Sequence, residues 1–292
     1  MLLGLFVPVS SKVMAAMPNL RVVGVSRAGL ENVNVAEATK RGILVFNVQG
    51  RNAQAVSDFT MGLMLAAARN IAKAHYAIMN GEWRKTFPNS DYVPEIEGKV
   101  IGLIGFGHIG RLVARKLSGF MPAKIMVYDP YTPKEAIEKS AGCEKVEDLN
   151  GLLKESDFVS LHARLSDSNK GMIGNEQLAM MKKTAYLINT ARAGLVDQDA
   201  LADALKNGTI MGAALDVFTT EPIPSDSPYL GLDNVTLTTH IAGTTADALG
   251  NSPYLLMNDI ASLFPGDAAQ YIVNKEGLDH PEFKKWLDGV KK

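Results

Sequence analysis

The chain has 292 residues, of which 47% are hydrophobic and 21% are charged. This composition is typical of a globular protein with one or two domains and a sizeable core. The 30 basic residues nearly balance the 31 acidic residues, so no overall charge favours a nucleic acid or a membrane surface as a partner. A single cysteine, Cys143, excludes an intramolecular disulfide, and no cluster of cysteine and histidine suggests a metal site.

Short apolar runs rich in Val, Ile and Leu alternate along the chain with longer segments of helical period. This alternation predicts an α/β fold in which helices cover both faces of a parallel sheet. The expected strands are residues 3–9, 21–25, 43–48, 100–104, 124–128, 158–161, 185–189, 212–216 and 235–238. The opening run has no basic region and is interrupted by Pro8, so it predicts a strand rather than a signal peptide. A cytoplasmic location follows by default.

Two long helices are expected, one over residues 53–80 and the other over residues 245–264. In the first, apolar residues recur at spacings of three and four, which places one apolar stripe on one face. Such helices can carry the chain from one domain into a second and back again. We therefore expect a discontinuous domain formed by residues 1–80 and 248–292, and an inserted domain formed by residues 81–247.

A glycine-rich turn follows the expected strand at 100–104. Gly105, Gly107 and Gly110 form the pattern G-x-G-x-x-G, and a helical segment comes directly after it. The first glycine permits a tight turn, the second lets the backbone approach a pyrophosphate, and the third lets the helix pack closely on the strand. The start of that helix offers free N–H groups and a positive dipole end to phosphates. The pattern predicts a dinucleotide site.

Asp129 stands at the end of the next expected strand, nineteen residues after Gly110. A carboxylate at this position accepts hydrogen bonds from the adenosine ribose hydroxyls, and its charge repels a 2′-phosphate. NAD is therefore expected as the cofactor rather than NADP.

Three polar residues with catalytic potential follow expected strands in the second half of the chain. Arg192 lies in the motif N-T-A-R, Glu221 in D-V-F-T-T-E-P and His240 in H-I-A-G. The carboxyl ends of parallel strands line the ligand crevice of an open sheet. A cation, an acid and an imidazole together at that edge are what the reduction of a 2-oxo acid requires.

At these motifs, which occur in family order and spacing, the chain resembles the D-isomer specific 2-hydroxyacid dehydrogenases, and within them the D-3-phosphoglycerate dehydrogenase branch. The resemblance implies two Rossmann-like domains, with the dinucleotide-binding domain inserted in a flavodoxin-like substrate domain. It also implies NAD as the cofactor and a homodimer formed largely through the first long helix and its surroundings. The reaction implied is hydride transfer between nicotinamide and C2 of a small D-2-hydroxy or 2-oxo acid.

The resemblance also assigns roles to single residues. Arg192 would bind the substrate carboxylate, His240 would exchange a proton with the C2 oxygen, and Glu221 would hydrogen-bond the other nitrogen of that imidazole. The implied substrate loop contains Arg27, Ala28 and Gly29. The implied cofactor contacts, besides the three glycines and Asp129, are His108, Ile109, Thr190, Ala191, Asp216 and Gly243. Asp216 is expected on the nicotinamide side, and His162 near the cofactor.

Several alternatives stay open at this point. The substrate could be phosphohydroxypyruvate, hydroxypyruvate, glyoxylate or a longer 2-oxo acid. An NAD-binding, corepressor-like interaction module has the same motifs. The first expected strand corresponds to the third strand of the family's substrate domain, so a truncated and weakly active or inactive form of a longer protein is also expected. In that case the strand would form a long, apolar sheet edge.

Overall fold

The computed structural model describes residues 1–265 and 269–290, so residues 266–268 and 291–292 of the expected substrate domain lie outside the described part. The chain divides into two compact units, one formed by Met1–Asn52 with Thr244–Lys292 and the other by Ala53–Gly243. In the described ranges, no helix is both long enough and apolar enough to cross a membrane.

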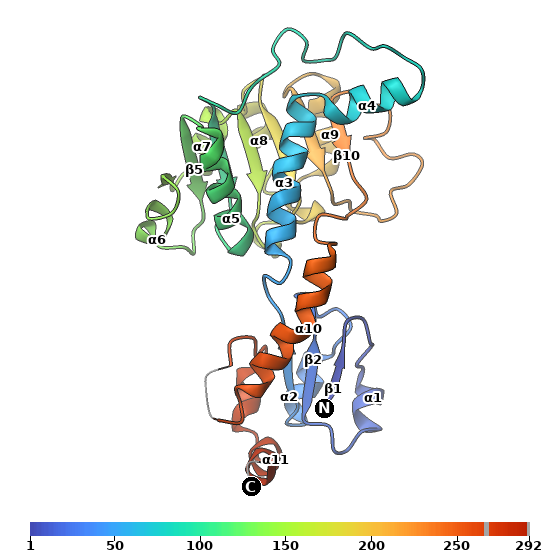
Figure 1. Ribbon diagram of the computed structural model, residues 1–292, viewed down its shortest axis with the longest axis vertical. Coiled ribbons are helices and arrows are strands. Elements are labelled where there is room, and N and C mark those ends of the chain that lie inside the picture. Colours follow the sequence, from blue (N-terminus) through green and yellow to red (C-terminus); the bar gives the residue numbers. More distant parts are fainter. Residues whose placement is uncertain (266–268, 291–292) are drawn as a thin grey trace. The chain divides into compact units, whose positions relative to one another are not determined.

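The unit Ala53–Gly243 is built on a parallel sheet of seven strands, in the order β10-β9-β8-β7-β4-β5-β6 (Figure 1). The strands are β4 (Val100–Ile104), β5 (Lys124–Tyr128), β6 (Cys143–Lys145), β7 (Phe158–Leu161), β8 (Tyr186–Asn189), β9 (Gly212–Leu215) and β10 (Val235–Leu237). The strand order reverses at β4, which pairs with β5 on one side and β7 on the other. This Rossmann-like arrangement creates a crevice at the carboxyl ends of the strands.

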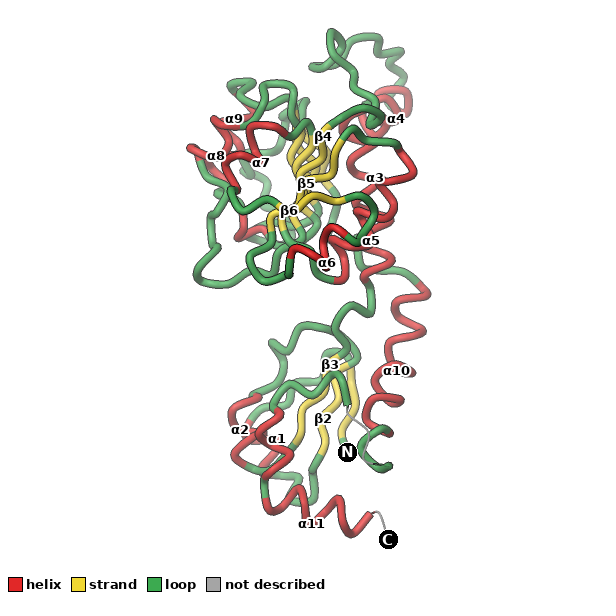
Figure 2. The backbone as a smooth tube through the Cα atoms, turned by 90° about the vertical axis from the view of Figure 1, so that its left-hand side faces the viewer, coloured by secondary structure: helices red, strands yellow, loops and turns green. Residues whose placement is uncertain are grey.

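Helices cover both faces of this sheet, as expected (Figure 2). Helices α3 and α5 pack on one face, where Met64, Val113 and Leu117 enclose the apolar residues of β4. Helices α7, α8 and α9 pack on the other face through Leu152, Leu178 and other leucines. The helices of this unit are α3 (Ala53–Ala68), α4 (Ile71–Met79), α5 (His108–Leu117), α6 (Lys134–Glu138), α7 (Leu149–Glu155), α8 (Asn175–Met180), α9 (Gln198–Lys206) and two 3₁₀ turns, η1 (Ser118–Phe120) and η2 (Ala193–Leu195).

The expectation of one continuous helix over residues 53–80 is wrong. Helix α3 ends at Ala68 and α4 begins at Ile71, because Asn70 adopts a left-handed conformation with φ of 56°. The Asn70 amide donates to Asn89 Oδ1 at 2.6 Å, and Asn89 Nδ2 donates to the carbonyl of Ala68 at 2.9 Å. Asn89 therefore satisfies a carbonyl that the end of α3 leaves without a helical partner.

The unit boundaries also differ from the expected ones. Helix α3 was expected in the discontinuous domain, yet Met64 and Ala68 are fully buried in the same core as Leu103 and Val113 of the other unit. The apolar stripe of α3 packs on the seven-stranded sheet, so the first boundary falls at Asn52 rather than at residue 80.

The unit formed by the two chain ends contains a parallel sheet in the order β1-β2-β3. Its strands are β1 (Leu2–Gly4), β2 (Val22–Val25) and β3 (Leu44–Asn47). Helices α1 (Ser11–Ala15) and α2 (Val35–Lys40) pack on one face. Helices α10 (Ala246–Ala261) and α11 (Pro281–Val290) pack on the other, and a 3₁₀ turn, η3 (Lys275–Asp279), precedes α11 (Figure 2).

The first strand is much shorter than the expected range 3–9. β1 pairs with β2 and stands at one edge of the sheet, and its middle residue Leu3 is 39% exposed. The chain turns after Gly4, and Phe6 and Val7 are exposed. Pro8, which has no N–H to donate to a ladder, follows this turn. The edge is therefore short rather than long and apolar.

Candidate active site

The three residues with catalytic potential follow three neighbouring strands. Arg192 comes after β8, Glu221 after β9 and His240 after β10, and these strands pair with one another in parallel. The loops that contain the three residues therefore leave the same edge of the sheet. All three residues are exposed there.

Glu221 and His240 form a direct pair. His240 Nδ1 lies 2.7 Å from Glu221 Oε2, and the N–H of Phe218 donates to Glu221 Oε1 at 2.9 Å. Burial acts to raise the pKa of Glu221. The hydrogen bonds from His240 and Phe218, with the positive charges of His240 and Arg192, outweigh burial and lower that pKa below its ordinary value. Glu221 therefore stays anionic at neutral pH, and Nε2 is the imidazole nitrogen left for proton exchange.

His240 is held in an unusual backbone conformation, with φ of 57°. Asp216, which is fully buried at the end of β9, fixes the turn around it. Asp216 Oδ1 accepts from the N–H of Ile241 at 3.0 Å and from the Thr238 hydroxyl at 2.6 Å, and Oδ2 accepts from the N–H of Ala242 at 2.9 Å. Sequence reasoning placed Asp216 on the nicotinamide side and did not foresee that both of its oxygens bind the His240 turn.

Asn189 shapes the loop that presents Arg192. Asn189 Oδ1 accepts from the N–H of Ala191 at 3.0 Å, and Asn189 Nδ2 donates to the carbonyl of Arg192 at 3.0 Å. The guanidinium itself is exposed, and its Nη1 donates to the carbonyl of Ala191 at 2.7 Å. Sequence reasoning noted Asn189 as part of a motif but gave it no role. Its position as the last residue of an apolar strand, three residues before Arg192, was the available signal.

The glycine turn between β4 and α5 has the geometry that its sequence predicts. Gly105 has φ of +97°, and a Cβ there would lie 2.5 Å from the N atom of Ala163. A Cβ on Gly110 would lie 2.3 Å from the carbonyl oxygen of Gly105. Gly107 is the N-cap of α5 and faces open space. Gly105 and Gly110 thus require glycine for close packing. Gly107 leaves the backbone at the start of the helix accessible to a phosphate.

Asp129 is buried at the end of β5 and binds backbone N–H groups. Its Oδ2 accepts from Phe106 at 2.6 Å, and its Oδ1 accepts from Tyr131 and Thr132 at 2.8 and 2.9 Å. A carboxylate has about four acceptor positions, so the carboxylate that fixes the glycine turn can accept one further hydrogen bond.

His162 follows β7 and packs against the same turn, because a Cβ on Gly110 would lie 3.6 Å from the Cβ of His162. Both ring nitrogens are buried, and neither finds a hydrogen-bond partner among the described residues. Burial lowers the pKa of His162 to about 3, so the ring is neutral. A buried neutral imidazole without partners, beside a glycine turn, fits a site that receives a polar group of a cofactor.

Thr190 lies next to this region at the end of β8, where its hydroxyl is 2.8 Å from that of Thr60 on α3. Sequence reasoning did not single out Thr60, because nothing in a helical apolar stripe marks a threonine as a partner for a distant loop.

The expected substrate loop belongs to the other unit and follows β2. The carbonyl of Ala28 accepts from Asn47 Nδ2 at 2.7 Å, which ties the loop to the end of β3. The Arg27 guanidinium pairs with Glu31 at 3.0 Å and lies 5.0 Å from the ring centroid of Phe6. Part of the positive charge of Arg27 is therefore already balanced within its own loop.

The fold and the glycine turn define a class of protein, the dinucleotide-binding proteins of Rossmann type. Residues 61–242 match the family described as the D-isomer specific 2-hydroxyacid dehydrogenase, NAD binding domain. The chain therefore belongs to the D-isomer specific 2-hydroxyacid dehydrogenase family, whose cofactor is NAD, and the expectations of fold class and family are confirmed.

Similar proteins include a D-3-phosphoglycerate dehydrogenase of Methanocaldococcus jannaschii, 41% identical over 95% of this chain and 52% of that protein. A glyoxylate reductase of Thermofilum pendens is 42% identical over 92% of this chain and 79% of its own length. Among solved structures, the D-lactate dehydrogenase of Lactobacillus jensenii with NAD⁺ is similar with a TM-score of 0.79 and 29% identity, over 91% of this chain and 83% of that one. The chain spans about half the length of the first of these relatives.

Proposed function

We propose that this protein transfers a hydride between NAD and C2 of a small D-2-hydroxy or 2-oxo acid. The observation that carries the proposal is the His240–Glu221 pair, which lies at the same sheet edge as Arg192. A carboxylate that fixes an imidazole, together with a nearby guanidinium, suits proton exchange with an oxygen next to a carboxylate.

In the direction of reduction, His240 Nε2 donates a proton to the C2 oxygen of the 2-oxo acid, and it takes the proton back in oxidation. Glu221 stabilises the protonated imidazole and holds the ring in one orientation through the 2.7 Å contact at Nδ1. When bound, the cofactor supplies the hydride, so the residues provide alignment, charge and the proton.

Arg192 binds the substrate carboxylate in this proposal, because the planar guanidinium fork matches a carboxylate with two parallel hydrogen bonds. The loop of Arg27, Ala28 and Gly29 remains the proposed substrate loop, because its backbone N–H groups suit a carboxylate. The positive charge of Arg27 is shared with Glu31, so its contribution to binding an anion is smaller than that of Arg192.

The cofactor site follows the carboxyl ends of β4, β5 and β7–β9. His108 and Ile109, in the first turn of α5, offer N–H groups to the phosphates, and Asp129 accepts from the ribose. The other proposed contacts are Gly105, Gly107, Gly110, His162, Thr190, Ala191, Asp216 and Gly243. Asp216 accepts three hydrogen bonds in the His240 turn, so at most one acceptor position of its carboxylate remains for the cofactor.

We further propose a homodimer formed through α4 and the segment that follows it. Ile71, Tyr76, Met79 and Trp83 are large apolar residues exposed by 56%, 71%, 71% and 76%. Large apolar side chains that are exposed together on one short segment favour an interaction surface. Replacement of Tyr76 and Met79 by glutamate is expected to give a monomer in light scattering, whereas Leu230→Glu, on another loop, leaves the dimer intact. A wild-type monomer would contradict the proposal.

The proposed activity is tested by NADH oxidation with glyoxylate, hydroxypyruvate, 3-phosphohydroxypyruvate and pyruvate in turn. We expect turnover with at least one of them and a D-2-hydroxy acid as the product. NADH binding without turnover of any acid would instead favour the interaction-module alternative. The cytoplasmic location remains part of this proposal, because NAD and 2-oxo acids are water-soluble metabolites.

A further inference from the structure

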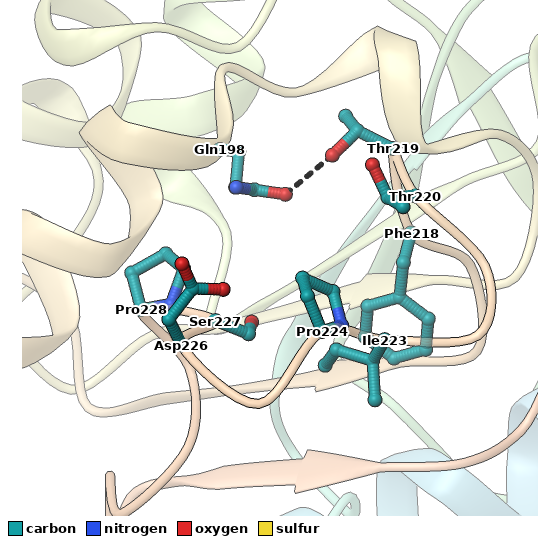
Figure 3. Close-up of a pocket in the computed structure, with 9 residues that line it drawn as sticks. All are labelled: Gln198, Phe218, Thr219, Thr220, Ile223, Pro224, Asp226, Ser227 and Pro228. Carbon is teal, nitrogen blue, oxygen red and sulfur yellow. Dashed lines mark hydrogen bonds between the residues drawn. The ribbon is translucent and has the colours of Figure 1, made fainter.

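The segment 218–222, which contains Glu221, packs on the core through the half-buried Phe218 and is exposed beyond it. Thr219, Thr220, Glu221 and Pro222 are all exposed. Within the segment, the N–H of Phe218 donates to Glu221 Oε1 at 2.9 Å. Thr219 connects the segment to the rest of the unit, because its hydroxyl donates to Gln198 Oε1 at 2.6 Å (Figure 3).

Gln198 belongs to a well-anchored element. It is the first residue of α9, and Asp197 caps this helix by accepting from the N–H groups of Asp199 and Ala200 at 3.1 and 3.0 Å. The buried Tyr229 donates its hydroxyl to the carbonyl of Gln198 at 3.3 Å. The Thr219–Gln198 bond therefore joins an exposed loop to a rigid helix start.

A cavity of about 210 Å³ lies beside the Thr219–Gln198 hydrogen bond. Gln198 and Thr219 line it together with Thr220, Pro224 and Asp226 (Figure 3). Because side chains do not fill the space next to Thr219 and Thr220, packing does little to hold this part of the loop. The hydrogen bond from Thr219 to Gln198 holds this part of the loop instead.

We propose that Gln198 is a positioning residue for the reaction, because it binds Thr219 and so keeps Glu221 in place against His240. The kinetic part of this inference rests on the proposed dehydrogenase function. The structural part, the placement of Glu221, does not depend on catalysis and is measurable in the free protein.

The ionisation of Glu221 reports its placement. Burial acts to raise the pKa of Glu221, but the hydrogen bonds from His240 and the Phe218 N–H, with the nearby positive charges, lower it overall. When the loop loses its bond to Gln198, these hydrogen bonds lengthen. The pKa of Glu221 then rises toward the ordinary value of a glutamate.

The test uses four variants of the full chain. Gln198→Leu and Thr219→Val each remove the bond, Thr219→Ser retains the hydroxyl that donates to Gln198, and Thr220→Val is the matched control at the neighbouring exposed threonine. The Glu221 carboxyl is titrated by ¹³C NMR and assigned with Glu221→Gln, and each fold is checked by thermal melting.

We expect the pKa of Glu221 to rise in Gln198→Leu and in Thr219→Val, and to stay unchanged in Thr219→Ser and Thr220→Val. In turnover assays, the first two variants are expected to lose roughly three- to tenfold in kcat with KM unchanged. If Glu221 titrates as in the wild type in both Gln198→Leu and Thr219→Val, the inference is wrong. A wild type without dehydrogenase activity would overturn the proposed function, while the titration would still decide the role of Gln198.

Discussion

The Nδ1 atom of His240 lies 2.7 Å from Oε2 of Glu221, although nineteen residues separate the two along the chain. The contact arises because β9 and β10 are parallel neighbours, so the loops that follow them start at the same edge of the sheet. Asp216, at the end of β9, binds the N–H groups on the other side of His240. The imidazole is thus fixed through its ring by one carboxylate and through its backbone by another.

Replacement of Glu221 by glutamine is expected to lower kcat by about ten- to hundredfold, less than the 10²–10⁴ attributed to a general acid itself. Glutamine keeps the size of the side chain but not the charge that stabilises protonated His240. Because the pKa of Glu221 is lowered, its carboxylate persists above that pKa and is lost as the pH falls through it. The kcat–pH profile of the wild type should therefore have an acid limb from Glu221 that the variant lacks. An unchanged kcat and profile, with exposed Glu95→Gln as the control, would contradict this role.

Replacement of Asp216 by asparagine is expected to destabilise the fold by about 1–3 kcal/mol, because one buried acceptor of a backbone N–H becomes a donor. The His240 turn, with its left-handed residue, loses its support at the same time. Urea unfolding measures the loss, and Asp226→Asn in an exposed position should stay within about 0.5 kcal/mol of the wild type. Equal stability of Asp216→Asn and the wild type would count against the described role of Asp216.

NADH is expected to bind at least about tenfold more tightly than NADPH, because the buried Asp129 carboxylate repels a 2′-phosphate. Fluorescence titration with the two cofactors gives both dissociation constants. Asp129→Ser should narrow the difference between the dissociation constants of NADH and NADPH. It should also lower the melting temperature, because the N–H groups of Phe106, Tyr131 and Thr132 lose their acceptor. Comparable affinities in the wild type would refute the assignment of Asp129.

The Cys143 thiol is expected to react at least about a hundredfold more slowly with a disulfide reagent in the folded protein than in urea. Cys143 is buried in the core of the larger unit, and burial raises the pKa of its thiol to about 11. Little thiolate is therefore present at pH 8. The rate is followed by absorbance at constant reagent concentration, and equal rates in both states would show that the thiol is accessible.

The sequence predicted the central strands well, because buried parallel strands are continuous apolar runs. The ranges for β4, β5 and β7 agree with the structure. β6 was missed because it is a short edge strand with charged Glu144 and Lys145. The break at Asn70 was missed because the side chain that stabilises it, Asn89, is distant in the chain and satisfies the carbonyl of Ala68.

For the candidate site, motifs indicated which residues follow which strands, and parallel pairing of those strands explains why Glu221 and His240 meet. Contacts between segments that are distant in the chain could not be predicted, because no local sequence pattern marks them. The bonds from Asp216 to Ile241 and Ala242 and the bond from Thr219 to Gln198 depend on how loops pack in space. An exposed glutamine at a helix start is, by sequence alone, only a surface residue.

The most direct test of the proposed role of His240 compares the wild type with His240→Gln. Steady-state turnover is measured with NADH and the best 2-oxo acid, and NADH affinity is measured by fluorescence. His240→Gln is expected to lose at least about a hundredfold in kcat, because the proton donor is gone. NADH should bind it as tightly as the wild type, because the glycine turn and Asp129 are unchanged. A His240→Gln variant that turns over as fast as the wild type would contradict the assignment of His240 as the proton donor.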